Sequence, residues 1–371
     1  MFRILSAIAI VVGASVFAWF AGAGDLDSIL AEAARGKGVP GASLMTIQDY
    51  HVAEQAVYGV RRLGESSPIT DNDVWMIGSD GKAMTAVMIA RLVERGVLSW
   101  NATLADLWPE AVSRMRPEYR SVTLLQLVAH TSGLPENIED EKTVNEFFYN
   151  ESTASSTERR EAYVLRALQD APAVRAGRFR YSNTGFLLAA VLAERATKSS
   201  YEALMQNEVF TPLGMKSAGF GIPPEGQPSG HMRGRIALAG DVNPDFFAPA
   251  GNMYMSLKDW ALFCIDQMQG ANGKGALLTP ETYTLMQTPQ SSQPVSMGWF
   301  VRDSLKGLPG PVLYHEGSDG AWFAVVALFP KSGAGVLAVT NAGKTMGGEK
   351  LDLAAALAAA KQLTSAAGST K

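Results

Sequence analysis

Ser79 and Lys82 have the clearest potential for chemistry in this sequence, and they stand three positions apart in Ser79-Asp80-Gly81-Lys82. A serine hydroxyl becomes a strong nucleophile when a base takes its proton, and a lysine can be that base when its pKa is low enough to leave the amine neutral. If a helix begins at Ser79, both side chains lie on one face, and the positive N-terminal end of that helix disfavours an ammonium ion. The same residues also fit an ordinary helix cap followed by a surface lysine.

A second candidate segment is Tyr181-Ser182-Asn183, which lies between a glycine-containing turn and a predicted helix over residues 184–197. A phenol close to a cation can shuttle a proton, and an amide such as that of Asn183 can hold a lysine or a substrate carbonyl. Loops beside helix starts often carry catalytic groups. The alternative is a tyrosine packed in the core, with Asn183 as a helix cap.

A third segment, His315-Glu316-Gly317-Ser318, ends a predicted strand. Residues on a strand alternate between its faces, so His315 and Gly317 share one face. Gly317 allows a substrate backbone to approach closely. The N–H of Ser318 is a candidate to join the N–H of Ser79 in an oxyanion hole. A single histidine is more often structural than catalytic, so a catalytic role for this segment depends on its occurrence together with the other two.

Together and in this order, the three segments resemble the β-lactamase-like serine hydrolases. That family includes class C β-lactamases, penicillin-binding proteins and D-alanyl-D-alanine carboxypeptidases, D-aminopeptidases and one family of carboxylesterases. The resemblance extends from about residue 26 to residue 363, and residues 127–135, 249–256 and 297–299 add to it.

The resemblance implies a role for each candidate residue. Ser79 is the expected acylated nucleophile, and Lys82 and Tyr181 are expected to share the general base and acid work, with the division between them left open. Asn183 is expected to orient Lys82 or the substrate. His315 stands where β-lactamases usually carry a lysine, which implies a position near Tyr181 and the substrate carboxylate.

The sequence departs from the family pattern at two places. Asp80-Gly81 is unusual inside the first motif, because Gly81 weakens a helix by about 1 kcal/mol relative to alanine and Asp80 favours a charged Lys82. A slow or degenerate site is therefore an open alternative. His315 is only partly charged at neutral pH, so a permanent cation for a β-lactam carboxylate is missing. If the charge on His315 matters, activity should change between about pH 5.5 and 7.5.

The elements that must position these residues follow from periodicity. Helical spacing occurs at 25–35 and 351–363, and strand patterns occur at 41–48, 52–60, 312–315, 321–329 and 334–340. The middle of the chain is mostly helical, with an irregular stretch over 219–251. Both chain ends thus supply strands. We predict an α/β (α+β) fold of the β-lactamase/transpeptidase type, in which an antiparallel sheet from both chain ends is flanked by helices and carries an inserted, mostly helical subdomain.

These patterns predict boundaries for each part of the chain. Residues 24–78 and 271–363 form the two parts of the α/β subdomain, residues 79–270 form the helical subdomain, and residues 364–371 form a flexible tail. The substrate site is expected in the cleft between the two subdomains.

Residues 1–23 read as a signal peptide, because Arg3 precedes an uncharged apolar run that ends in Ala21-Gly22-Ala23. We therefore expect an exported protein, periplasmic or secreted. The alternative is an uncleaved N-terminal membrane anchor. Cys264 is the only cysteine, so an intramolecular disulfide is impossible, and its helical context predicts a buried core residue.

Composition and the remaining motifs exclude several functions. The net charge of −4, without a basic stripe, argues against nucleic acid binding. The other histidines, His51, His130 and His231, lack ligand spacing, so no metal site and no cofactor are expected. We expect His130 to be structural and His51 to be solvated, and His231 is a candidate to line the cleft. Residues 36–41 match G-x-G-x-x-G but follow a helix, which is the reverse of the dinucleotide-binding order.

The sequence therefore predicts a serine hydrolase that cleaves a small ester or a D-amino-acid peptide through an acyl-Ser79 intermediate. A β-lactamase or a D-alanyl-D-alanine carboxypeptidase is an alternative. A second alternative is a non-catalytic protein that binds penicillin or peptidoglycan peptides in the same cleft. The expected partner is in each case a small ester, peptide or β-lactam.

Overall fold

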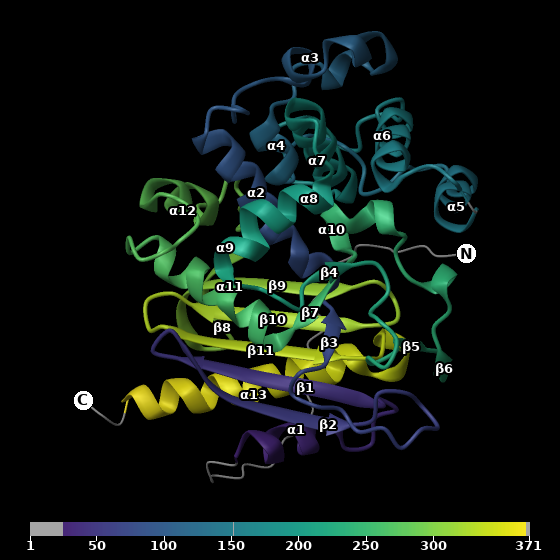
Figure 1. Ribbon diagram of the computed structural model, residues 1–371. Coiled ribbons are helices and arrows are strands. Elements are labelled where there is room, and N and C mark those ends of the chain that lie inside the picture. The colour runs from purple at the N-terminus through teal and green to yellow at the C-terminus, as the bar shows by residue number, and fades with distance from the viewer. Residues whose placement is uncertain (1–24, 151, 369–371) are drawn as a thin grey trace.

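A computed structural model of the chain describes residues 25–150 and 152–368, so the predicted signal peptide lies outside the described residues. Its centre is a six-stranded antiparallel sheet with the strand order β2-β1-β11-β10-β9-β8. Both ends of the chain meet in this sheet, because β1 pairs with β11 (Figure 1). The strands are β1 (Gly41–Gln48), β2 (His51–Gly59), β8 (Phe300–Leu305), β9 (Leu308–Ser318), β10 (Phe323–Phe329) and β11 (Ala334–Thr340).

Helices cover both faces of the sheet, and the sequence of β10 shows why. All seven residues of β10 are buried. Val325 and Ala327 face the core shared with α1 (Leu26–Ala34) and α13 (Gly348–Gly368), whereas Val326 packs into the larger core under the helical layer. A strand buried on both faces reads as a continuous apolar run instead of an alternating one. Figure 1 shows α1 and α13 on one side of the sheet and the helical layer on the other.

The helical layer lies above the sheet in Figure 1 and supplies most of the site. Three short strands form a second sheet in the order β3-β7-β4, and β5 and β6 form a hairpin. The helices of this part are α2 (Lys82–Glu94), α3 (Leu104–Leu107), α4 (Leu124–Val128), α5 (Glu141–Tyr149), α6 (Ser156–Ala167), α7 (Asn183–Thr197), α8 (Tyr201–Met205), α9 (Thr211–Leu213), α10 (Ala248–Gly251), α11 (Leu257–Gly270) and α12 (Pro280–Gln287); the short strands are β3 (Val74–Met76), β4 (Gly219–Phe220), β5 (His231–Met232), β6 (Arg235–Ile236) and β7 (Met253–Ser256).

The predicted fold class is confirmed, and four details differ. β8 was not predicted, because it is an edge strand in which three of six residues are polar and none is buried. The stretch 219–251, predicted to be irregular, contains β4, β5, β6 and α10. The predicted tail from 364 begins too early, because α13 continues to Gly368. Helix α11 packs on β1, β10 and β11, although the sequence placed it in the inserted subdomain. The boundaries at 78 and 270 stay predictions.

Candidate active site

Ser79 lies in a single 3₁₀ turn, Gly78–Gly81, between β3 and α2, so the α-helix begins at Lys82 and not at Ser79 as predicted. A 3₁₀ turn has three residues per turn and superimposes residues i and i+3, so the two side chains still share one side. Lys82 Nζ lies 2.9 Å from Ser79 Oγ. Packing explains why residue 81 is a glycine, because a Cβ there would lie 2.4 Å from the terminal methyl group of Met253.

The amine of Lys82 is buried with few polar neighbours. The residue is fully buried, and Nζ donates to the Ala250 carbonyl and lies 5.0 Å from the centre of the Tyr181 ring. Burial lowers the pKa of Lys82 from 10.5 to about 7, although the charges of Glu136 and Asp80 act to raise it. The neutral amine is therefore well populated at physiological pH. A surface lysine, the alternative weighed above, is excluded.

The phenol of Tyr181 shares a hydrogen bond with the Ser79 side chain. Burial raises the pKa of Tyr181 above its ordinary value, so the phenol keeps its proton at neutral pH. The ring stacks on His130 with 4.4 Å between ring centres and 22° between planes. His130 Nδ1 accepts the N–H of Ser182 at 2.9 Å, which fixes the histidine under the tyrosine. The prediction that His130 is structural is confirmed, and its place beneath Tyr181 shows what it supports.

Asn183 is close to the site but does not hold Lys82. It is the first residue of α7, and the helix cap is Ser182, whose hydroxyl accepts the N–H of Gly185. The Asn183 side chain donates to Asn137 Oδ1 at 3.2 Å. Contact with a substrate stays a prediction for this residue.

The absence of a side chain at Gly317 is required by contact with the protein's own backbone. A Cβ at this position would lie 1.9 Å from the carbonyl oxygen of Ile77 and 2.9 Å from the nitrogen of Ser79. The glycine therefore lets β9 run against the nucleophile turn of the same protein, whereas we expected it to admit a substrate backbone. A Cβ on Gly78 would lie 2.4 Å from the nitrogen of Ser318, so the backbones of Ser79 and Ser318 lie side by side at the expected oxyanion position.

His315 corrects two predictions. It is 2% exposed, and its Nδ1 lies 3.0 Å from Asp80 Oδ1. Burial lowers the pKa of His315 to about 3 and raises the pKa of Asp80 well above its ordinary value. The imidazole of His315 is therefore uncharged at neutral pH. A pKa of about 3 differs from the partial charge, and from the titration between pH 5.5 and 7.5, that the sequence led us to expect for His315. In this position the side chain offers no cation to a substrate carboxylate.

Two backbone carbonyls that position α2 at the site, those of Pro249 and Ala250, were not predicted from the sequence. Ala250 accepts the amine of Lys82, and the preceding carbonyl, of Pro249, accepts the hydroxyl of Thr85 at 2.9 Å. Thr85 stands one turn after Lys82 on α2, so two side chains of one helix bind two consecutive carbonyls. Because the single proton of Thr85 goes to Pro249, the Tyr201 hydroxyl, 2.7 Å away, is the donor in their contact. Backbone acceptors carry no signal in a sequence.

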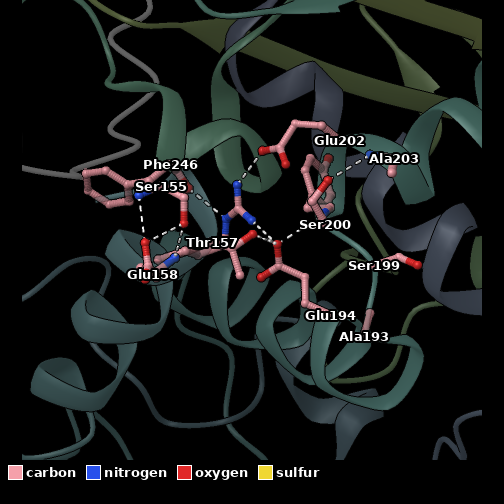
Figure 2. A network of polar contacts seen from close by, with 12 residues as sticks. Ser155, Thr157, Glu158, Ala193, Glu194, Ser199, Ser200, Glu202, Ala203 and Phe246 are labelled. Atoms are coloured by element: carbon pink, nitrogen blue, oxygen red, sulfur yellow. Dashed lines mark hydrogen bonds and ion pairs between the residues drawn. The ribbon is translucent and has the colours of Figure 1, made fainter. Parts of the chain in front are cut away.

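A buried ion network holds the chain just before Pro249 and Ala250, at Phe246. The fully buried guanidinium of Arg160 donates to the carbonyl of Phe246 at 2.9 Å and to the carboxylate of Glu202 at 2.6 Å, and it also binds Glu194. Figure 2 shows the carboxylates of Glu194 and Glu202 and the Phe246 carbonyl converging on this one group. The network ties α6, α7 and α8 to the residues that lead into α10.

The remaining candidates are structural. His231 is buried, its Nε2 accepts the N–H of Leu63 at 2.9 Å, and its Nδ1 lies 2.8 Å from the Asn341 carbonyl, so both ring nitrogens are engaged within the fold. His51 is exposed and Cys264 is buried, as predicted. Within residues 25–150 and 152–368, no group of three or more His, Cys, Asp or Glu side chains is arranged to hold a metal ion. No helix in those same ranges is long and apolar enough to cross a membrane.

The sheet with its helical layer, together with a serine, a buried lysine and a tyrosine in contact, defines the class of active-site-serine proteins. Residues 26–361 match the Beta-lactamase family model, and the chain belongs to that family. Family members are generally serine hydrolases, and some are non-catalytic. The resemblance inferred from the sequence is thereby confirmed.

Similar proteins and structures agree with this membership. The chain is 24% identical over 336 residues to penicillin-binding protein 4 of Amycolatopsis lactamdurans, covering 82% of this chain and 81% of that one. It is 23% identical over 326 residues to Protein flp of Staphylococcus aureus (strain MW2), which covers 85% of this chain but only 62% of that relative's length. The octameric penicillin-binding protein homologue from Pyrococcus abyssi superposes with a TM-score of 0.70 at 24% identity, covering 85% and 73% of the two chains. SurE superposes with a TM-score of 0.72 at 22% identity, covering 91% and 75%.

Proposed function

We propose that the protein is a serine hydrolase that cleaves an ester or amide through an acyl-Ser79 intermediate. The observation that carries this proposal is the 2.9 Å contact between Ser79 Oγ and an amine whose pKa is about 7. A nucleophile beside a base that is neutral at working pH is the arrangement needed for covalent catalysis.

In the acylation step, neutral Lys82 accepts the proton of Ser79 as Oγ forms a bond to the carbonyl carbon. The carbonyl oxygen becomes an oxyanion, which the N–H groups of Ser79 and Ser318 stabilise. The Tyr181 phenol, which keeps its proton at neutral pH, gives it to the leaving oxygen or nitrogen as the scissile bond breaks. Lys82 then returns a proton to Tyr181. This division of roles, with Lys82 as base and Tyr181 as acid, rests on the opposite directions of their pKa shifts.

In the deacylation step, water takes the place of the leaving group. One water proton passes to the Tyr181–Lys82 pair while the water oxygen binds the acyl carbon, and Ser79 Oγ departs and recovers a proton. The carboxylic acid product then leaves. The neutral state of His315 favours substrates without a carboxylate beside the scissile bond, because no cation from this residue would hold one.

Intact mass spectrometry tests the proposal with a panel of neutral esters, peptide amides and a β-lactam. We expect turnover of at least one ester or amide and a transient adduct that maps to Ser79. Ser79→Ala should abolish both, and Ser199→Ala is a matched control at a half-buried position just after α7 that should change neither. Turnover that survives Ser79→Ala would refute the acyl-serine mechanism. A stable adduct without turnover would instead support the non-catalytic alternative.

A further inference from the structure

A cavity of about 350 Å³ is lined by Met76 and Asp319, which stand three positions before Ser79 and one after Ser318, and the mechanism above does not explain it. Met76 and Trp322, each 2% exposed, form its buried wall. Ile222 and Leu238 also line it, and they are 60% and 69% exposed, so their apolar side chains stand at its mouth. A concave site with an apolar rim is typical of a small-molecule pocket.

Two walls of the cavity continue directly into the active site. Asp319 lines the cavity and follows Ser318, the expected oxyanion donor. Val242 also lines it, and the side chain of the next residue, Asn243, donates to the Gly251 carbonyl at 2.9 Å. A Cβ on Gly251 would lie 3.3 Å from the nitrogen of Ser79. A group attached to a carbonyl held at Ser79 would therefore have this cavity as its neighbour.

Asp319 has half of its hydrogen-bonding capacity unused. Its Oδ1 accepts the N–H groups of Ala321 and Trp322, each at 3.1 Å. Its Oδ2 is buried and has no hydrogen-bond partner among the described residues. Burial raises the pKa of Asp319 to about 6, so the carboxyl is mostly ionised at pH 7. A buried carboxylate oxygen without a donor is costly, and a ligand N–H or ammonium group would satisfy it.

The charges of the cavity lining point to the same kind of ligand. Arg61 is paired with Asp73 at 2.6 Å, and Arg62 is paired with Glu65 at 3.2 Å. No cation forms an ion pair with Asp319 in the part of the chain that the structure describes. The lining therefore presents neutralised arginines and an uncompensated carboxylate, which favours a cationic ligand over an anionic one.

We propose that this cavity is the acyl-group subsite of the hydrolase and that Asp319 selects substrates whose acyl group carries a protonated amine beside an apolar side chain, which is an aminoacyl group. The apolar side chain lies against Trp322 and Met76, and the ammonium group binds Asp319 Oδ2. This inference rests on the proposed function, because it assumes a carbonyl bound at Ser79.

The test compares leucine methyl ester with methyl 4-methylpentanoate, which has the same side chain without the amine, at pH 7. Both enantiomers of the leucine ester are used. We expect kcat/KM for one leucine ester to exceed that for the amine-free ester by at least tenfold. N-acetylation of the leucine ester, which removes the charge without changing the protein, should remove most of this preference.

The matched variant is Asp319→Asn, which keeps an Oδ1 acceptor for the two backbone N–H groups and removes the charge. It should reduce the preference to within about twofold of unity, and Glu54→Gln on exposed β2 should leave the preference unchanged. Equal rates for the two esters in the native protein, or a preference that persists in Asp319→Asn, would overturn the proposal.

A binding measurement separates this proposal from the hydrolase proposal. If the native protein hydrolyses none of the esters, the catalytic assignment fails, and the subsite is then tested by calorimetry on Ser79→Ala. Leucinamide should bind at least tenfold more tightly than 4-methylpentanamide, and the difference should vanish in Ser79→Ala/Asp319→Asn. Equal affinities for the two amides would overturn the subsite irrespective of turnover.

Discussion

The pKa of Lys82 predicts a specific pH dependence for the proposed reaction. If the neutral amine is the base and its pKa is about 7, it is neutral in about 9% of molecules at pH 6, about 50% at pH 7 and about 91% at pH 8. The value of kcat/KM should therefore rise about tenfold from pH 6 to pH 8 and then level off. A lysine with its ordinary pKa of 10.5 would give about a hundredfold rise over the same interval, continuing to about pH 10.

The size of this shift comes from burial. A fall from 10.5 to about 7 corresponds to roughly 5 kcal/mol of preference for the neutral amine over the ammonium ion. The carboxylate of Glu136 opposes the shift, so Glu136→Gln should move the midpoint to lower pH by less than one unit. The charge of Asp80 also opposes the shift, so Asp80→Asn should move the midpoint in the same direction.

The assay measures kcat/KM for a neutral ester, which does not titrate, between pH 5 and 10 at constant ionic strength. His315→Gln is the key control, since the sequence alone attributed a change in this range to that histidine. The midpoint near pH 7 should persist in His315→Gln. A midpoint above pH 9 would refute the burial argument for Lys82. Loss of the midpoint near pH 7 in His315→Gln would show that His315, and not Lys82, is the group that titrates.

The other predictions concern packing and reactivity. Gly317→Ala should lower kcat/KM by at least a hundredfold and destabilise the fold by about 1–3 kcal/mol, because its Cβ meets the backbone of the nucleophile turn; urea unfolding and kinetics measure both. Thr85→Val should cost about 1–3 kcal/mol and reduce kcat, since it removes the donor to Pro249, and unchanged stability would contradict that hydrogen bond. Cys264 should not react with a thiol reagent until urea unfolds the protein, because it is buried and burial raises its pKa; fast labelling of the native protein would contradict this.

The sheet could be predicted from the sequence because its central strands are strongly marked. β1, β10 and β11 are apolar runs bounded by turns, and the structure gives β10 and β11 within two residues of the predicted ranges. The edge strand β8 carries no such signal, since Arg302, Asp303 and Ser304 stand in its middle. The fold therefore followed from burial patterns, and the elements that were missed are those that burial does not mark.

The site was partly predictable for a related reason. Ser79, Lys82 and Tyr181 belong to short motifs whose residue types suggest their chemistry, and the structure brings the three side chains together. Their support was not visible, because the Ala250 carbonyl is a backbone atom that any residue could supply. The partner of His315 was hidden as well, since Asp80 lies 235 positions away in the sequence.

Burial explains why one site contains both an active base and a histidine that is uncharged at neutral pH. Desolvation disfavours whichever form of a group is charged, so it lowers the pKa values of Lys82 and His315 and raises the pKa of Asp80. For Lys82 the neutral form is the base that Ser79 requires. For His315 it removes a cation that would otherwise select anionic substrates. The proposed mechanism therefore leaves substrate charge to be selected outside this desolvated centre, and Asp319, one residue beyond the expected oxyanion donor, is a carboxylate in a position to select it.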